Sequence, residues 1–239
     1  MLEMKAVKIV FHAGTVNEKT ALAGVDLHLA PGEFVTVIGG NGAGKSTLLN
    51  CVSGAYAPTS GEIWIDGQNV THMPEHRRAK LLGRVFQDPM MGTAGNMWIE
   101  ENLALALRRG QKRGLRWGIT QKEREMFKEQ LRRLDLGLED RLSTKVKLLS
   151  GGQRQALTLL MATLQKPKLL LLDEHTAALD PKTARKVLEL SEQIIEEHGL
   201  TSLMVTHNMR DAIRYGNRLI MMHEGRVAVD VSGEEKKKL

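Results

Sequence analysis

One stretch of the sequence decides the fold: Gly39-Gly40-Asn41-Gly42-Ala43-Gly44-Lys45-Ser46. It has the spacing of a phosphate-binding loop, in which two spaced glycines are followed by a lysine and a serine. The buried-strand pattern Glu33 to Ile38 precedes the loop, and the helical pattern Lys45 to Val52 follows it and ends at Gly54. Since the motif requires a strand before it and a helix after it, these flanks favour a nucleotide site over a chance glycine-rich turn.

The residue types of this loop explain its expected chemistry. Glycines let successive backbone N–H groups point at phosphate oxygens, and the helix start adds partial positive charge. We expect Lys45 to neutralise the β and γ phosphates and the Ser46 hydroxyl to contact Mg²⁺, a hard cation that prefers oxygen ligands. A nucleotide and Mg²⁺ are the expected cofactors, and the nucleotide is ATP if the resemblance described below holds; the expected binding residues of the loop are Gly39, Gly40, Asn41, Gly42, Ala43, Gly44, Lys45, Ser46 and Thr47.

Two carboxylates follow the aliphatic run Leu169 to Leu172, which is typical of a strand buried on both faces. Asp173 and Glu174 would therefore leave the carboxyl end of a buried strand, where open α/β sheets bind their ligands. Alone, such an acidic pair would be interpreted as the start of a helix. Beside a phosphate-binding loop, we expect Asp173 to help hold Mg²⁺ and Glu174 to act as general base toward the attacking water.

The rest of the chain separates into strand-rich and helix-rich regions. Alternation and turn signals predict strands at Ala6 to Phe11, Val25 to Leu29, Glu62 to Ile65 with the turn Asp66-Gly67, Leu203 to Thr206, and Arg218 to Met222 joined through Glu224-Gly225 to Arg226 to Val231. Helical periodicity covers Met97 to Leu142, with a capping box at Thr120 to Glu123 and an apolar stripe of Phe127, Leu131 and Leu134. Asp180-Pro181 is typical of a helix start and Gly199 of its end.

These patterns predict an α/β fold with a P-loop NTPase core. The core is expected to contain a mixed sheet flanked by helices and an N-terminal antiparallel β subdomain, with an α-helical subdomain inserted into it. Residues 1–239 are expected to form one domain, in which 1–88 and 166–239 are the nucleotide-binding α/β core and 89–165 are the helical subdomain.

The composition sets further limits. The 239 residues are 42% hydrophobic and 26% charged, which indicates a folded globular chain, and the longest aliphatic run is far too short to cross a bilayer. The single cysteine, Cys51, fits a reducing compartment. With 34 basic and 28 acidic side chains, the net charge is +6, but we expect Arg108, Arg109, Lys112, Arg113 and Arg116 to form a solvated loop rather than a nucleic-acid surface. Glu234 to Lys238 is expected to be a charged tail.

A further motif, Leu149-Ser150-Gly151-Gly152-Gln153, precedes the carboxylate strand, and with it the chain resembles the ATP-binding subunits of ABC transporters. In that family this signature binds the γ-phosphate of the ATP that the opposite subunit holds. The local chemistry agrees, because Ser150 and two glycines at a helix start present a hydroxyl and free N–H groups. The resemblance places the signature in the helical subdomain and implies a homodimer that sandwiches ATP.

The resemblance extends over nearly the whole chain and implies roles for four more residues. Gln87 matches the glutamine that contacts Mg²⁺ and the water, and His207 matches the switch histidine at the γ-phosphate. Asp180 matches the loop that crosses the dimer interface, and Phe11 is the candidate for the aromatic ring that stacks on adenine. The expected catalytic residues are therefore Lys45, Gln87, Glu174 and His207, and the expected metal ligands are Ser46, Gln87 and Asp173.

Three positions depart from the usual family pattern. His175 stands where proline is common, Ala177 where serine is common, and Gly40 where proline or serine is common. The two carboxylates are intact, so the departures concern the shapes of the loops that carry them.

The resemblance leaves several kinds of ABC ATPase to distinguish. Repair-type members separate the halves of the cassette by a long coiled coil, translation-type members carry two cassettes, and a non-hydrolysing regulator would be expected to lose Glu174 or His207; the sequence has none of these features. An ATPase subunit that is a separate chain from its membrane partner is typical of binding-protein-dependent importers. The sequence around Gln87 and the signature resembles that of a bacterial importer group of the amino-acid type. A separate-chain exporter of the lipoprotein or macrolide type is the alternative.

The resemblance also implies partners and a location. The partners are ATP, a second copy of the chain, an integral-membrane permease and, indirectly, a substrate-binding protein, whereas no nucleic acid is expected. The implied place is the cytoplasmic face of the inner cell membrane, where a peripheral subunit would power the uptake of a small solute.

Overall fold

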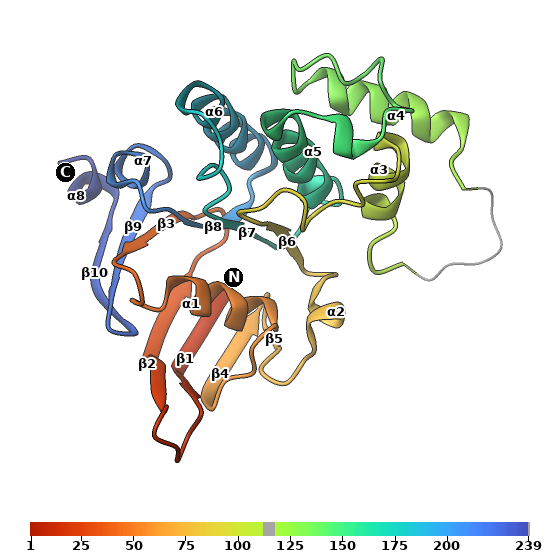
Figure 1. The fold of residues 1–239 in the computed structure, drawn as a ribbon. Coiled ribbons are helices and arrows are strands. Elements are labelled where there is room, and N and C mark those ends of the chain that lie inside the picture. The colour runs from red at the N-terminus through yellow and green to blue at the C-terminus, as the bar shows by residue number, and fades with distance from the viewer. Residues whose placement is uncertain (112–117, 239) are drawn as a thin grey trace.

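The computed structural model describes residues 1–111 and 118–238, and its elements form two sheets with helices around them (Figure 1). The first sheet contains β1 (Leu2–Phe11), β2 (Lys19–Leu29), β4 (Ser60–Ile65) and β5 (Gln68–Asn69). The second contains β3 (Phe34–Gly39), β6 (Leu82–Val85), β7 (Leu169–Asp173), β8 (Thr201–Val205), β9 (Arg218–His223) and β10 (Arg226–Ser232). The helices are α1 (Lys45–Ser53), α2 (Glu75–Arg78), α3 (Ile99–Leu107), α4 (Gln121–Arg132), a 3₁₀ turn (Val146–Leu148), α5 (Gly151–Thr163), α6 (Pro181–His198), α7 (Met209–Arg214) and α8 (Gly233–Lys236). None of these described helices combines the length and the apolar character that a membrane span requires.

The strands run differently in the two sheets. The first sheet has the order β2-β1-β4-β5, and its neighbouring strands pair antiparallel. The second has the order β10-β9-β3-β8-β7-β6, in which β10 and β9 pair antiparallel and the other neighbours pair parallel. The carboxyl ends of β3, β7 and β8 therefore meet at one edge, where open α/β sheets bind ligands.

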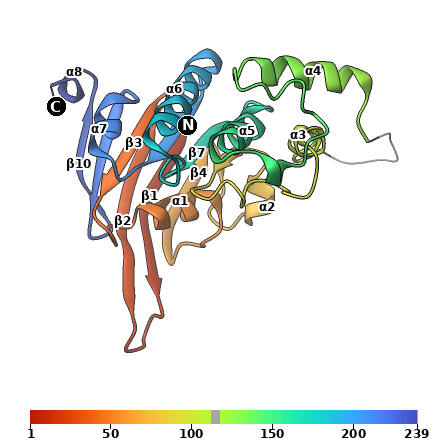
Figure 2. The same ribbon diagram turned by 45° about the horizontal axis from the view of Figure 1, so that its top comes forward.

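Two hydrophobic cores lie on opposite faces of the second sheet. On one face, Leu48 of α1 shares a cluster with Ile63 of the first sheet and Leu171 of β7. On the other face, Leu172 of β7 shares a cluster with Leu188 of α6. Because successive side chains of a strand point to opposite faces, the aliphatic run of β7 supplies both cores. Figure 1 shows α1 between the two sheets, and Figure 2 shows the β1–β2 hairpin extending away from the rest of the molecule.

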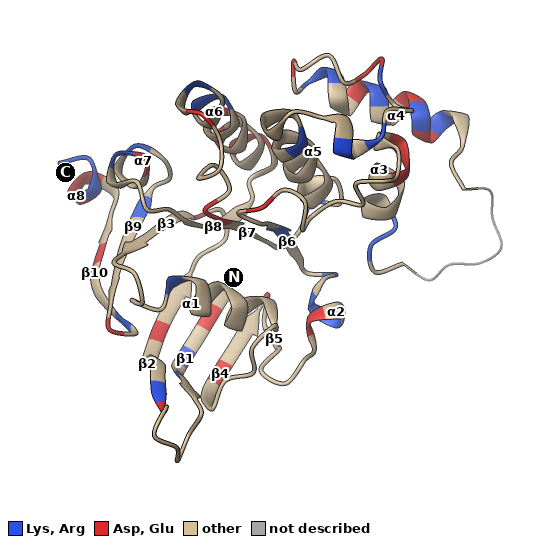
Figure 3. Ribbon diagram, viewed as in Figure 1, with Lys and Arg blue, Asp and Glu red and all other residues tan. Residues whose placement is uncertain are grey.

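α3 and α4 lie beside the sheets and share a third core with part of α5. Phe127 and Leu131 of α4 are fully buried, and Leu134 is almost so, which confirms the predicted stripe. The predicted capping box is also present, since Thr120 Oγ1 accepts from the N–H of Glu123 at 3.2 Å and a Glu123 carboxylate oxygen accepts from the N–H of Thr120 at 2.7 Å. Figure 3 shows basic and acidic residues mixed along α4, as expected for a helix whose other face meets water.

α5 belongs to two cores at once. Its Leu157 packs with α3 and α4, whereas its Leu159 packs in the cluster of β7 and α6. The division of the chain into a helical subdomain of residues 89–165 and an α/β core remains a proposal. The last helix of that subdomain, α5, also packs in the α/β core.

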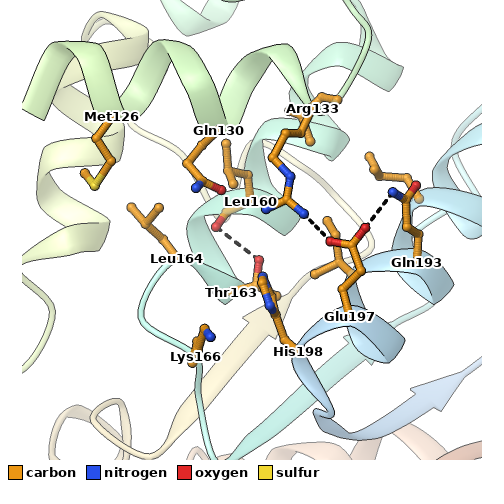
Figure 4. Close-up of a pocket in the computed structure, with 13 residues that line it drawn as sticks. Met126, Gln130, Arg133, Leu160, Thr163, Leu164, Lys166, Gln193, Glu197 and His198 are labelled. Carbon is orange, nitrogen blue, oxygen red and sulfur yellow. Dashed lines mark hydrogen bonds and ion pairs between the residues drawn. The ribbon is translucent and has the colours of Figure 1, made fainter.

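A cavity of about 130 Å³ lies where α4, α5 and α6 meet (Figure 4). Leu160 and Ile194 contribute to its apolar lining. Arg133, which follows α4, forms an ion pair with Glu197 of α6, and Glu197 also accepts from the Gln193 side-chain amide at 2.8 Å. The ion pair between Arg133 and Glu197 therefore connects the end of α4 to α6 beside the cavity.

Both predicted hairpin turns are confirmed. Asp66-Gly67 connects β4 to β5 with φ angles of 52° and 76°, and Glu224-Gly225 connects β9 to β10 with φ angles of 46° and 73°. Two successive positive φ angles are what a two-residue hairpin turn requires.

The two ends of the chain differ from their predictions. β1 begins at Leu2, whereas the predicted strand begins at Ala6. The alternation of buried and exposed residues is interrupted there, because Ala6 has φ 48° and the register with β2 shifts between Met4 and Val7. The predicted charged tail contains most of α8, and its Lys236 is buried and donates to the carbonyl oxygens of Tyr215 and Gly216. A lysine-rich pattern cannot reveal such acceptors, since they come from a distant part of the chain.

The predicted solvated loop from Arg108 to Arg116 is wrong at its beginning. Arg108 forms an ion pair with Glu123 at 2.7 Å, and Arg109 donates to the Ala162 carbonyl oxygen at 3.2 Å. Burial also lowers the pKa of Arg109. The first two arginines therefore pack against α4 and α5, while Lys112, Arg113 and Arg116 lie outside the described residues.

Candidate functional site

The phosphate-binding loop connects β3 to α1 and is packed tightly against neighbouring strands. A Cβ on Gly39 would lie 2.4 Å from the carbonyl oxygen of Met222 in β9. Gly44 has φ +101°, and a Cβ there would lie 2.6 Å from the carbonyl oxygen of Ala21 in β2. Neither position has room for a side chain, so the glycine spacing of the motif is a steric requirement of this packing.

Lys45 is buried at the first position of α1, and its amine points back into the loop. Its Nζ donates to the carbonyl oxygens of Gly39 at 2.8 Å and Gly40 at 3.1 Å. The N-cap residue, Gly44, provides no side-chain cap for the helix. An amine beside the uncapped N–H groups of a helix start forms a site suited to phosphate oxygens.

A pocket of about 440 Å³ opens over this loop. The predicted residues that line it are Phe11, Asn41, Gly42, Ala43, Gly44, Lys45, Ser46, Thr47, Gln87, Glu174 and His207. Gly39, Gly40 and Asp173 are outside the lining; the two glycine carbonyl oxygens accept from the Lys45 amine, and Asp173 pairs with Arg84. The structure brings most of the predicted site residues into one place, and their roles remain predictions.

Glu174 and His207 face each other just after β7 and β8. Nε2 of His207 lies 2.6 Å from Oε1 of Glu174, and the carboxylate is 8% exposed whereas the imidazole is 49% exposed. Glu174 has φ 45°, and its N–H donates to the Val205 carbonyl oxygen at 3.0 Å. A left-handed conformation is strained for a residue other than glycine, and such strain is common at functional sites as well as in turns.

Asp173 ends β7 on the face of the sheet that packs against α1. Burial raises the pKa of its carboxyl group, and the nearby Arg84 and Lys45 oppose that shift. The Ser46 hydroxyl, the Gln87 amide and the Asp173 carboxylate all offer oxygen atoms, which Mg²⁺ prefers. The donor set therefore fits the predicted cation.

His175, a departure from the family pattern, is buried against α6. Its Nε2 lies 3.0 Å from Oγ of Ser191, and that hydroxyl donates its own proton to the Val187 carbonyl oxygen at 2.8 Å. Nε2 must then carry a proton and donate to Ser191. Burial lowers the pKa of His175 to about 4, so the ring is neutral near pH 7. The side chain at the usual proline position thus anchors the loop after Glu174 to α6.

The predicted signature lies at the start of α5, and none of the residues 149–153 is among the described residues that line the pocket. Leu149 is buried, and Ser150 caps the helix. The Ser150 hydroxyl accepts from the N–H of Gln153 at 3.3 Å, and the Gln153 side chain accepts from the N–H of Ser150 at 3.2 Å. The signature is therefore held in shape by its own capping box.

The two glycines of the signature pack against the start of α6. A Cβ on Gly151 would lie 3.1 Å from Cδ2 of Leu179, and a Cβ on Gly152 would lie 2.2 Å from Cγ2 of Thr183. Asp180 caps α6 by accepting from the N–H of Thr183 at 3.1 Å. The two segments predicted for the dimer interface consequently lie side by side.

Phe11 ends β1, and Tyr56, which follows α1, supports its ring. The ring centroids lie 5.4 Å apart, with an interplanar angle of 81°. Lys19 pairs with Phe11 across the β1–β2 hairpin and lines the pocket, although it is absent from the predicted residues. The hairpin register is the signal that could have found it, because cross-strand partners share one location. No local pattern points to Tyr56, since its contact depends on how α1 packs.

Comparisons with known proteins agree with this geometry. Residues 22–177 match the family described as ABC transporter. The chain is 45% identical over 239 residues to the tyrosine transport ATP-binding protein of Clostridioides difficile (strain R20291), covering 100% of this chain and 95% of that protein. It is 36% identical over 205 residues to the thiamine import ATP-binding protein ThiQ of Yersinia pseudotuberculosis serotype I (strain IP32953), covering 86% of this chain and 82% of the relative.

A solved structure extends the similarity to three dimensions. The dimeric post-hydrolysis state of the ATP-binding cassette MJ0796, bound to ADP and Pi, has a TM-score of 0.82 and 32% sequence identity, covering 97% of this chain and 98% of that chain. The predicted fold class is thereby confirmed. The family match and the relatives of nearly equal length lead to one conclusion: this chain belongs to the ABC transporter family, as an ATP-binding subunit whose ATPase activity is coupled to transport.

Proposed function

We propose that this chain is the motor subunit of a binding-protein-dependent importer, and that its ATP hydrolysis powers the uptake of a small solute of the amino-acid type through a separate permease. The observation that carries the motor role is the pocket in which Lys45, Glu174 and His207 meet over the phosphate-binding loop. Relatives named for tyrosine transport and for methionine and thiamine import support the direction of transport. The relatives named for tyrosine and methionine support an amino-acid cargo.

The pocket supports a division of binding roles among its residues. The loop N–H groups and Lys45 would bind the phosphates of ATP, and Phe11 would stack on adenine. Ser46, Gln87 and Asp173 would hold Mg²⁺, which neutralises charge on the phosphates when bound. Ser46 follows the loop after β3, Gln87 follows β6 and Asp173 ends β7, whereas Phe11 ends β1 and lines the pocket. A bound nucleotide and its cation could therefore meet these side chains together.

The paired Glu174 and His207 support the hydrolytic role. The Glu174 carboxylate is shielded from bulk water and would accept a proton from the water that attacks the γ-phosphate. His207 contacts that carboxylate in this structure, and its exposed position would let it turn to the γ-phosphate when ATP is present. Gln87, which lines the same pocket, would help to orient the water.

A complete site would require a second copy of the chain. Ser150 and Asp180 belong to a surface separate from the pocket lining. In a two-fold dimer, the phosphate-binding loop of one copy and the signature of the other would enclose the same ATP, which makes two equivalent sites. The dimeric structures of the similar cassette MJ0796 support this arrangement.

An exposed apolar surface is the proposed contact with the permease. Its large exposed side chains are Met90, Met91, Trp98, Leu105 and Leu148. Local pairing brings several of them together, because Lys147 donates to the Gly95 carbonyl oxygen at 2.9 Å and Trp98 forms a bridge with Lys145. Exposed apolar side chains that lie close together are typical of protein contacts. The subunit would then lie on the cytoplasmic face of the cell membrane, and a substrate-binding protein would act through the permease.

Lys45→Ala tests the nucleotide pocket. The substitution removes the buried amine, and the loss of charge-assisted contacts to phosphate should weaken ATP binding by about tenfold or more, as measured by calorimetry. Lys128→Ala, at an exposed position on α4, should bind ATP as the wild-type chain does. Unchanged ATP affinity in Lys45→Ala would contradict the assignment.

Cysteine cross-linking to a co-expressed permease tests the docking surface. Met91→Cys and Asn96→Cys are suitable because both residues are exposed, whereas a Cβ on Gly92 would lie 2.6 Å from Cγ2 of Thr158. Val16→Cys, at the fully exposed tip of the β1–β2 hairpin, is the control. We expect cross-links from the first two positions and none from Val16→Cys, and the reverse pattern would place the docking surface elsewhere.

A further inference from the structure

Arg84 of β6 is a charged side chain that lies mostly inside the protein, with 13% of its side chain exposed. It shares a face of the second sheet with Leu82, which packs in the core on the α1 side. Its guanidinium donates from Nη2 to Oδ1 of Asn50 at 2.7 Å and from Nη1 to Oγ of Ser53 at 3.0 Å. Arg84 therefore ties β6 to the helix that begins at the phosphate-binding loop.

The same guanidinium reaches the end of β7. Arg84 is the register partner of Leu171, and Asp173 lies two residues farther along the same face. Nη2 lies 3.4 Å from Oδ2 of Asp173. A second carboxylate, that of Glu75, lies 3.9 Å from Nη1 and is 55% exposed, compared with 16% for Asp173. Asp173 is thus the shielded partner, and a contact with it is less weakened by water.

A further contact of the guanidinium is aromatic. The guanidinium carbon of Arg84 lies 4.5 Å from the centre of the Phe86 ring. Phe86 immediately precedes Gln87, which lines the pocket, so this stacking helps to hold the chain segment that contains the glutamine. Arg84 contacts Asp173 directly, and it also contacts α1, the helix that carries Ser46, and Phe86, the residue before Gln87.

We infer that Arg84 is a positioning residue for the divalent-cation site: it orients the Asp173 carboxylate and joins the three chain segments from which the cation ligands come. The inference rests on the proposed function, because it takes Ser46, Gln87 and Asp173 as the ligands. Side chains that hydrogen-bond to metal ligands typically change metal affinity by about 10–100-fold when they are removed. The planar fork is essential here, since a lysine offers a point charge that cannot contact Asn50, Ser53 and Asp173 together.

The test measures how strongly Mg²⁺ increases nucleotide affinity. A fluorescent ATP analogue is titrated in EDTA and in Mg²⁺. The dissociation constant in EDTA divided by that in Mg²⁺ gives a ratio, which is compared among variants. Arg84→Met should reduce this ratio by about tenfold or more, with the affinity in EDTA unchanged within about twofold, and Arg84→Lys should give an intermediate ratio. Arg132→Met removes an arginine whose ion pair with Glu129 is exposed, and it should keep the wild-type ratio.

Each outcome decides the inference. A wild-type ratio in Arg84→Met overturns it, and so does a larger ratio, which would make Arg84 a competitor of the cation for Asp173. Equal losses of affinity in EDTA and in Mg²⁺ also overturn it, because they indicate general damage to the pocket. If circular dichroism shows that Arg84→Met does not fold, a wild-type ratio in Arg84→Lys overturns the inference. A wild-type chain that binds no ATP, or whose affinity Mg²⁺ does not change, instead contradicts the proposed function itself.

Discussion

Cys51 lies fully buried on α1, in the core that joins this helix to both sheets. Burial raises the pKa of its thiol to about 11, and Arg78 opposes the shift only in part. The thiolate is the reactive form of cysteine, so the low thiolate fraction and the burial of the side chain should both protect Cys51 from reaction.

Thiol labelling tests this expectation at pH 8. A group with a pKa of about 11 is thiolate in on the order of one molecule in a thousand at that pH. The native wild-type chain should therefore not react with a disulfide reagent during the time in which Val16→Cys reacts at its added cysteine, and it should react fully after unfolding in guanidinium. Reaction of native Cys51 at the rate of the exposed cysteine would show that α1 opens easily.

At the residue scale, the predictable part of the site is the part that is local in the chain. The motif spacing predicts Lys45 and Ser46, and both line the pocket, because the strand, loop and helix that hold them are consecutive. Lys19 and Arg84 could not be predicted in this way. Their positions depend on which strand lies beside β1 and β6 and in which register.

At the element scale, the ends of α1 and α6 are predictable because a neighbouring glycine ends each helix, whereas the predicted helical stretch Met97 to Leu142 contains only α3 and α4 as helices among its described residues. Gly54 and Gly199 end α1 and α6 with φ angles of 88° and 59°, as expected for glycine at a helix end. The start of β1 and the burial of Lys236 in α8 depend instead on partners far away in the sequence, which explains why those predictions were wrong.

Two N-cap substitutions separate the structural role of a cap from a role in the dimer. Thr120→Ala and Asp180→Ala each remove one cap, so each should lower the free energy of unfolding by about 1 kcal/mol and the Tm by about 2–4 °C. Thermal unfolding of both variants checks whether the two losses of stability are equal. Asp180→Ala alone should also weaken ATP-dependent dimerisation, because Asp180 lies beside the signature glycines. Equal dimerisation of the two variants would leave Asp180 as a cap only.

At the scale of the whole molecule, the order of strands and helices along the chain predicts the α/β class but not how the layers share their cores. The placement of α5 in two cores and the ion pair between Arg133 and Glu197 are consequences of packing between distant segments. The most consequential global feature is the separation within one chain of the phosphate-binding loop from the signature at the start of α5. Under the proposed function, a chain arranged in this way would need a second copy to enclose ATP.

Sedimentation velocity of Glu174→Gln, with and without Mg-ATP, tests this claim most directly. The substitution keeps the shape of the side chain but removes the proposed base, so bound ATP should persist and hold two copies together. We predict a monomer without nucleotide and a dimer with ATP, with little hydrolysis, and a return to monomer when Ser150→Arg is added, since bulk and charge would then block closure at the signature. If Glu174→Gln hydrolyses ATP at the wild-type rate and sediments as a monomer in its presence, the two-copy mechanism is wrong for this chain.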